Sequence, residues 1–143
     1  MELENLRIYN ISMVLKEKIW NIVLKWNHLA VDTIGKQLIK SVDSIAANIS
    51  EGFGRYHIKE IRHFCYFSRG SLFESKTWIT KAYNRNLINS SSYNELSKEL
   101  KDLGIKLNNY INTLGKNLPD RVEENELPYS ISNDEFLQIL DDL

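Results

Sequence analysis

Cations recur at regular intervals in the middle of the chain. Arg62, Arg69 and Lys76 are spaced by seven residues, which places them in a nearly straight line along one side of a helix, and aromatic residues lie between them. Cations contact phosphates and aromatic rings stack on bases, and both contacts are typical of sequence-tolerant binding to single strands and RNA loops. The candidate nucleic-acid-binding residues are Arg55, Lys59, Arg62, Tyr66, Arg69, Phe73 and Lys76.

Packing is the alternative role for these residues. The rings would then pack against a neighbouring helix or subunit, and the cations would pair with acids, for instance Arg69 with Glu51 or Glu74. Residues 1–116 hold 17 Lys and Arg against 11 Asp and Glu, whereas residues 117–143 hold one Arg against 8 acidic residues. The basic part favours polyanionic partners, although its excess is well short of a strongly basic nucleic-acid-binding domain.

The residue patterns of common enzymes are missing. No two of the three histidines stand four residues apart with a glutamate between them, as two metal ligands on one helix face would require. Gly52-x-Gly54 follows a predicted helix and lacks the third glycine of a dinucleotide fingerprint. Cys65 falls on the expected inner face of a helix, where burial makes a thiol unreactive. We therefore expect no enzymatic activity, no cofactor and no metal.

The cysteine count and the hydropathy predict a compartment. A single cysteine cannot form an internal disulfide, which is typical of proteins in a reducing environment. The first residues are acidic, and no apolar run approaches the roughly 18 residues of a membrane span. These features predict a cytoplasmic protein without a signal peptide or membrane contact.

Apolar periodicity predicts four helices followed by an acidic tail. The expected helices cover residues 5–26, residues 32–52 with Asp32 as N-cap, residues 58–83, and a segment opened by the capping box Ser92-x-x-Glu95. Asn117-Leu118-Pro119 is expected to stop the last one. The predicted fold is all-α, with residues 1–116 forming an antiparallel up-and-down four-helix bundle and residues 117–143 forming an acidic C-terminal tail.

Each predicted helix has an apolar face. The second helix has five such residues on one face, and the fourth has leucines that step by four and three, the spacing of helices packed at a shallow angle. The first helix has two apolar stripes, of which only one can face the core. The other is expected to be buried by wider packing within the fold or by another copy of the chain, and we favour an oligomer interface. That second stripe is Leu6, Tyr9, Met13, Trp20 and Leu24.

Two further local patterns concern the connections. Gly52 and Gly54 predict a tight link between the second and third helices, with a positive φ at the helix C-terminus. In the tail, Ser132-x-x-Glu135 is a second capping box before a short apolar run, which is expected to dock as a helix. The tail is hypothesised to cover the basic face of its own or a neighbouring subunit and to compete there with a polyanion.

Two motifs give the chain a resemblance to a known family. Ser44-Ile-Ala-Ala-Asn-Ile-Ser-Glu-Gly52 followed by Phe53-Gly54-Arg55, and Arg69-Gly-Ser-Leu-Phe-Glu74, resemble bacterial four-helix bundle proteins encoded in intervening sequences of 23S ribosomal RNA genes. The similarity extends from residue 5 to about residue 116. The matching motif residues are Ser44, Asn48, Glu51, Gly52, Gly54, Arg55, Arg69, Gly70, Ser71 and Glu74.

The resemblance implies an architecture and partners. Family members assemble into rings of five, and their fold is similar to that of the accessory variability determinant of diversity-generating retroelements, which binds nucleic acid and its reverse transcriptase. The motif residues would be architectural: Asn48 and Glu51 would satisfy donors of the connection or pair with Arg55 or Arg69, and Gly70 would let a neighbouring helix approach. The family's usual proline is replaced here by Ala46.

We therefore predict a non-enzymatic, homo-oligomeric scaffold or accessory protein associated with RNA or DNA, with a reverse transcriptase or another protein as a candidate partner. The alternative is a protein–protein interaction module without specific nucleic-acid binding, in which the basic face or the tail meets a protein and any RNA binding is nonspecific.

Overall fold

The computed structural model describes residues 2–114, 116 and 132–141, and most of these residues are helical. A short 3-10 turn, Leu3–Asn5, precedes the first long helix. The remaining elements are α1 (Arg7–Val23), α2 (His28–Ala30), a π-helical turn (Val31–Gly35), α3 (Lys36–Phe53), α4 (Ile58–Asn84), α5 (Ser90–Leu114) and α6 (Asn133–Asp141).

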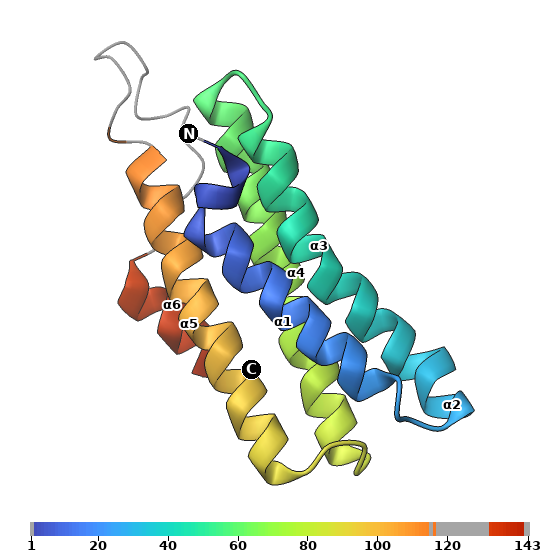
Figure 1. The fold of residues 1–143 in the computed structure, drawn as a ribbon. Helices are drawn as coiled ribbons and strands as arrows, with labels where there is room; N and C mark the ends of the chain where they lie inside the picture. Colours follow the sequence, from blue (N-terminus) through green and yellow to red (C-terminus); the bar gives the residue numbers. More distant parts are fainter. Residues whose placement is uncertain (1, 115, 117–131, 142–143) are drawn as a thin grey trace.

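The four long helices form an antiparallel up-and-down bundle, as predicted. α1, α3, α4 and α5 pack in chain order around a common core, and α5 closes the ring against α1 with much less contact than α3 makes with α4 (Figure 1). The short helix α6 lies on the outside of α5. The bundle therefore has a tightly packed side, α3–α4, and a looser side, α1–α5.

The predicted apolar faces form the core. Leu38, Val42, Ile45 and Ile49 of α3 are buried, as are Leu96, Leu100, Leu103 and Leu107 of α5. Further along α5 the buried residue is Ile111, whereas Tyr110 and Leu114 are only half-buried. The second apolar stripe of the first predicted helix is exposed at its C-terminal end. In the single chain, Trp20 is 46% and Leu24 is 62% exposed.

Small polar residues allow α3 and α4 to pack closely. Ser68 Oγ donates a hydrogen bond of 2.8 Å to the Ile45 carbonyl, and Ser75 Oγ lies 3.0 Å from Ser41 Oγ. Each of these serines is buried. The small side chains therefore let the two helices approach closely, and their polar atoms are satisfied across the interface.

Two predicted N-caps are wrong. Asn27 begins the helical segment before α3, since its Oδ1 accepts a 3.0 Å hydrogen bond from the Ala30 N–H, and Asp32 lies within the segment and pairs with Lys36 at 3.1 Å. Likewise, Asn89 Oδ1 accepts from the Ser92 N–H at 2.8 Å, so α5 begins at Ser90 and the Ser92–Glu95 box is not used. In both places an upstream asparagine caps the helix first.

Gly52 has a packing role instead of the expected turn role. α3 continues to Phe53, Gly54 has a φ of −76°, and no glycine among the described residues has a positive φ. A Cβ on Gly52 would lie 2.9 Å from Phe64 Cβ and 3.0 Å from the Ile61 carbonyl oxygen. The glycine is therefore required where α4 begins to pack on the end of α3.

The capping box at the start of α6 is confirmed. The Glu135 N–H donates to Ser132 Oγ at 3.1 Å, and the Ser132 N–H donates to Glu135 Oε2 at 2.9 Å. Phe136 and Leu140 are buried against the bundle, so the predicted docking of this helix is also confirmed. The predicted stop at Asn117-Leu118-Pro119 and the acidic stretch that follows it lie outside the described residues.

Candidate nucleic-acid interface

The seven predicted binding residues do not form one exposed surface. They divide into a group at the seam between α4 and α5 and a group at the α3–α4 connection. The seam group is Arg62, Tyr66, Arg69, Phe73 and Lys76, and the connection group is Arg55 and Lys59.

Arg62 is buried, so its predicted place on an exposed line of cations is wrong. Its residue exposure is 4%, and Nε and Nη1 have no hydrogen-bond partner in the part of the chain that the structure describes. Arg69 on α4 contacts Asn108 on α5. Arg62 precedes Arg69 by two helical turns, and because α4 and α5 are antiparallel it lies level with the end of α5 at Leu114. The C-terminal end of a helix carries partial negative charge, which stabilises a cation there.

Arg69 is half-buried and is held by uncharged groups. Its guanidinium lies 4.6 Å from the centre of the Tyr66 ring, and Nη1 donates to Asn108 Oδ1 at 3.1 Å. Burial lowers the pKa of Arg69, while the Tyr66 hydroxyl acts in the opposite direction. The expected pairing with Glu51 or Glu74 is wrong: Glu51 pairs with Arg55, and Glu74 accepts from Trp78 Nε1 at 3.2 Å.

Phe73 and Lys76 lie against α6. The Phe73 ring meets the Phe136 ring edge-on at 5.4 Å between centroids, and Lys76 Nζ donates to the Leu140 carbonyl. The C-terminal helix thus covers part of the predicted basic face of its own chain. Competition between this helix and a polyanion stays a prediction.

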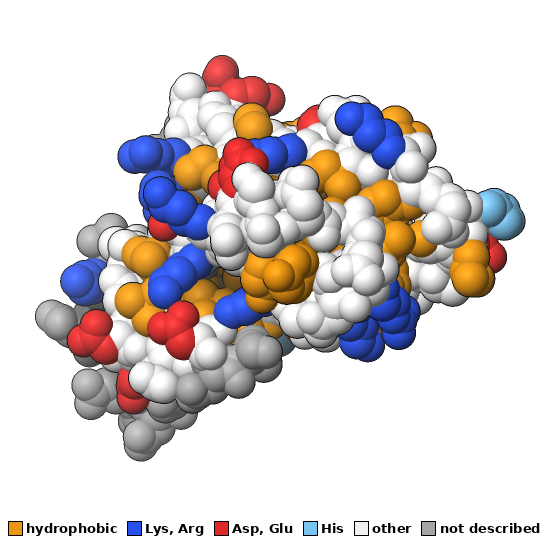
Figure 2. Space-filling view, turned by 90° about the horizontal axis from the view of Figure 1, so that it is seen from below, with side chains coloured by type: hydrophobic (Ala, Val, Ile, Leu, Met, Phe, Trp, Pro, Cys, Tyr) orange, Lys and Arg blue, Asp and Glu red, His pale blue; other side chains and the backbone are white. Residues whose placement is uncertain are grey.

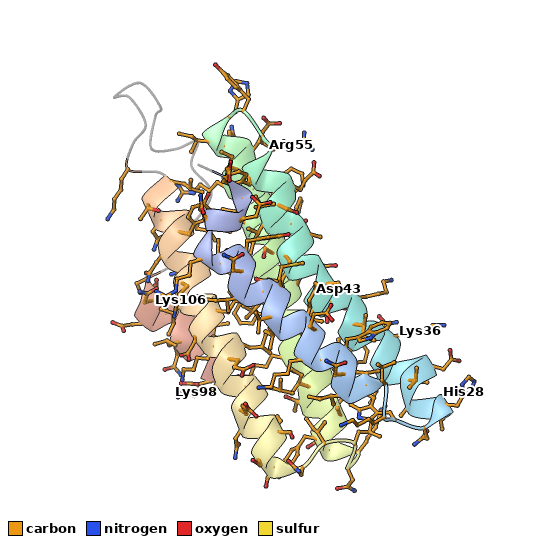
Figure 3. All side chains as sticks on the ribbon, viewed as in Figure 1. His28, Lys36, Asp43, Arg55, Lys98 and Lys106 are labelled. Atoms are coloured by element: carbon orange, nitrogen blue, oxygen red, sulfur yellow. The ribbon has the colours of Figure 1, made fainter. Side chains whose placement is uncertain are left out.

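Arg55 and Lys59 remain exposed at the α3–α4 connection, the end of the bundle opposite His28 (Figure 3). Arg55 pairs with Glu51 at 2.5 Å and lies 3.9 Å from Glu60, and its guanidinium is 4.8 Å from the centre of the Phe64 ring. A hollow of about 460 Å³ lies beside them. It is lined by Arg55, Lys59, Glu60, His63 and Phe64.

Five residues in or beside this hollow were missed from the sequence, namely Tyr56, His57, His63, Phe64 and Phe67. Tyr56 is 91% exposed, and its ring meets His57 edge-on at 5.0 Å. Phe67 is 49% exposed, and its centroid lies 4.4 Å from that of His63. We define the corner cluster as Arg55, Tyr56, His57, Lys59, His63, Phe64 and Phe67. Exposed aromatic rings beside cations are the arrangement that the α4 line of residues was predicted to provide.

The motif residues of α3 and α4 make mostly local contacts. Asn48 Nδ2 donates to the Ser44 carbonyl at 2.8 Å, so its predicted role in the connection is wrong, and the Ser71 carbonyl accepts from Ser75. Gly70 is exposed, and a Cβ there would meet nothing within 4 Å. Within one chain, therefore, Gly70 does not admit a neighbouring helix.

A second hollow, of about 430 Å³, lies on the looser side of the bundle. Acidic and basic side chains of α1 and α5 alternate with apolar ones around it. Its lining is Arg7, Asn10, Ile11, Val14, Leu15, Glu99, Asp102 and Lys106. Two carboxylates, Glu99 and Asp102, balance the two cations in this lining, whereas the first hollow has two cations and a single carboxylate, Glu60, so the second hollow is less suited to a polyanion.

Cys65 is buried, as predicted, and its surroundings suppress thiolate chemistry. The side chain is 1% exposed, and burial raises the pKa of its thiol to about 12, although Arg62 acts in the opposite direction. Across residues 2–114, 116 and 132–141, no three His, Cys, Asp or Glu side chains are grouped as metal ligands. No helix in the described ranges has the length and apolar character needed to cross a membrane.

The fold defines the chain as an all-α bundle of four long helices with up-and-down topology. Residues 4–109 match the family described as 23S rRNA-intervening sequence protein, and the chain belongs to this family. The match contains both motifs and the corner cluster and ends before α6. A comparison with curated proteins gives no match.

Proposed function

We propose that the protein is a non-enzymatic, homo-oligomeric accessory protein that binds RNA through the corner cluster. One observation carries this proposal: Tyr56 is 91% exposed beside Arg55 and Lys59 at the end of the bundle. An exposed ring is available to stack on an unpaired base, and the two cations can meet the flanking phosphates.

The contacts of the cluster favour loops or single strands over duplex. Arg55 is already partly neutralised by Glu51 and Glu60, so Lys59 is the stronger candidate for a phosphate contact. Phe67 and Tyr56 supply separate aromatic surfaces, and successive bases need such platforms. Each corner contributes few charges, so the affinity of a single chain should be modest and strongly dependent on salt.

Oligomerisation would multiply these weak contacts. Apolar side chains of α1 and α2 remain exposed in the single chain, with Val14 at 70%, Leu24 at 62% and Leu29 at 73%. At the end of the bundle away from the corner, hydrophobic side chains lie exposed between basic and acidic ones (Figure 2). Burying such residues against further copies, as in the ring of five that the resemblance implies, would present several corner clusters to one RNA.

The test is RNA binding by the full chain across a salt series. Lys59→Ala and Tyr56→Ala are compared with matched controls at the other end of the bundle, Lys36→Ala and Tyr83→Ala. We expect both corner variants to weaken binding to a stem-loop RNA, and Lys59→Ala to lower the log–log salt slope by about one for each copy in contact. Equal effects of the corner and control variants would overturn this site.

A protein–protein interaction module without specific nucleic-acid binding is the second candidate function. The observation that favours it is α6, a short helix from the same chain that is held on α4 and α5 by side chains at both of its ends. Absence of RNA binding at low salt, with an intact fold, would favour this function over the first.

A further inference from the structure

The outer side of α4 and α5 holds α6 through a fitted apolar contact. Phe136 is fully buried, and a Cβ on Gly104 would lie 2.6 Å and 2.8 Å from its Cε1 and Cζ atoms. Phe73 supports the same ring from the α4 side. The absence of a side chain at Gly104 thus makes the space that Phe136 fills.

Polar side chains hold both ends of α6. At its start, Asn108 Nδ2 donates to Asn133 Oδ1 at 2.9 Å, and Asn133 Nδ2 donates to Asn109 Oδ1 at 2.8 Å. At its end, Lys76 donates to the Leu140 carbonyl, and Lys101 pairs with Asp141 at 3.1 Å. We define the α6 seat as Phe73, Lys76, Lys101, Gly104, Asn108 and Asn109.

The arrangement has the features of a helical peptide bound to a protein. α6 has its own capping box, an aromatic anchor at Phe136 and a second apolar anchor four residues later at Leu140. Lys76 binds a backbone carbonyl near the helix C-terminus, where a cation is favoured. These contacts depend on helix geometry and on a few side chains, so another helix with the same pattern could make them.

The chain connection does not require α6 to stay in place. Asn133 contacts Asn108, which lies six residues before the end of α5 at Leu114, or about 9 Å along the helix. The 18 residues between Leu114 and Asn133 can span up to about 60 Å when extended. Moreover, the family match covers residues 4–109. The residues of the α6 seat lie within this match, whereas α6 itself lies outside it.

We propose that the α6 seat is a binding site for an amphipathic helix of a partner protein, and that α6 fills it in cis as a built-in competitor. The partner helix has an acidic first turn with an asparagine at its start, a phenylalanine three residues after that asparagine, and a leucine four residues further on. Its last-turn carbonyl binds Lys76. The site lies away from the corner cluster, so the proposal does not depend on RNA binding.

The probe is a fluorescent peptide with the sequence of residues 131–143, added to the full-length Phe136→Ser chain. This variant loses its own anchor, so we expect it to bind the peptide at least tenfold more tightly than the wild-type chain, whose seat is filled. The same peptide with alanine in place of the phenylalanine should not bind. A folded Phe136→Ser chain that ignores the peptide would overturn the proposal.

The matched pair Gly104→Ala and Gly70→Ala, each introduced into the Phe136→Ser chain, tests the location. Both replace a helical glycine with alanine, but only the Cβ at residue 104 enters the space of the phenylalanine ring. We expect Gly104→Ala to lower peptide affinity at least tenfold and Gly70→Ala to leave it unchanged. Equal affinities would overturn the proposed site.

Hydrogen exchange on the wild-type chain provides a measurement that needs no variant. The amides of α6 should exchange through local opening, much faster than those of α5, since an exchangeable occupant must leave without unfolding of the bundle. Protection of α6 equal to that of α5 would overturn the proposal. If wild-type and Phe136→Ser chains form a mixed assembly without any peptide binding, the occupant is a second copy and the partner-helix proposal fails.

Discussion

Gly52 and Phe64 lie so close that a Cβ on the glycine would be 2.9 Å from the Cβ of the phenylalanine. The contact sets the distance between the end of α3 and the first turns of α4, the elements that carry the corner cluster. A side chain at residue 52 would therefore displace the cluster as well as the core next to it.

We predict that Gly52→Ala destabilises the protein by about 1–3 kcal/mol, because overpacking outweighs the gain in helix propensity. Gly54→Ala is the control, since a Cβ there would have only ordinary contacts at 3.6 Å and 3.7 Å. Urea unfolding of both variants checks this. A Gly52→Ala chain as stable as the Gly54→Ala chain would contradict the close approach.

The helices could be predicted from the sequence because their apolar residues recur at the helical period. The helix starts could not. Asn27 and Asp32 are both good N-caps, as are Asn89 and Ser92, and periodicity does not choose between them. The choice depends on which residue first adopts an extended backbone, as Asn27 does with a ψ of 162°.

The candidate site was predicted less well than the fold. Spacing by seven correctly placed Arg62 and Arg69 on one side of α4, but it does not tell whether that side faces solvent or another helix. In the structure, Asn108 and the C-terminal end of α5 lie against this side of α4, so it faces another helix. Tyr56 was missed because it lies in the α3–α4 connection, outside any periodic pattern, although a tyrosine in a polar connection next to an arginine is a signal that could have been used.

Because the Cys65 thiol is buried, we predict that the folded protein loses stability at alkaline pH. Its pKa is raised to about 12 in the folded chain, from an ordinary value of 9.0, so between these values the unfolded chain has released the proton and the folded chain has kept it. The free energy of unfolding should therefore fall as pH rises above about 9, by at most about 1.4 kcal/mol per pH unit from this group. Urea unfolding of the wild-type and Cys65→Ala chains from pH 8 to pH 10.5 should show a steeper fall for the wild type. Parallel curves would mean that the thiol does not contribute.

We predict that a single charged side chain on the exposed apolar surface of α1 weakens the assembly of the protein. Trp20→Glu would place a carboxylate on the surface that further copies are proposed to bury, and burying an unpaired charge is costly. We expect light scattering to report a lower mass for Trp20→Glu than for the wild-type chain, with the helical content retained. Tyr56→Glu, at the exposed corner, is the control and should keep the wild-type mass. A wild-type chain that is monomeric would remove the oligomer from the proposed function.

From the contact between α6 and Lys76 we predict that the tail competes with nucleic acid. With α6 in place, Phe73 packs on Phe136 and Lys76 is bonded to the Leu140 carbonyl, so neither is free to contact RNA. Deleting residues 119–143 removes this cover and the acidic charge of the tail, and should therefore tighten RNA binding and steepen its salt dependence, because Lys76 adds a phosphate contact. The Phe136→Ser chain keeps the acidic residues and loses the anchor, so it separates the two effects: tightening by both variants assigns the competition to α6, and tightening by the deletion alone assigns it to charge. Unchanged affinity in both, measured at several salt concentrations, would show that the tail does not regulate RNA binding.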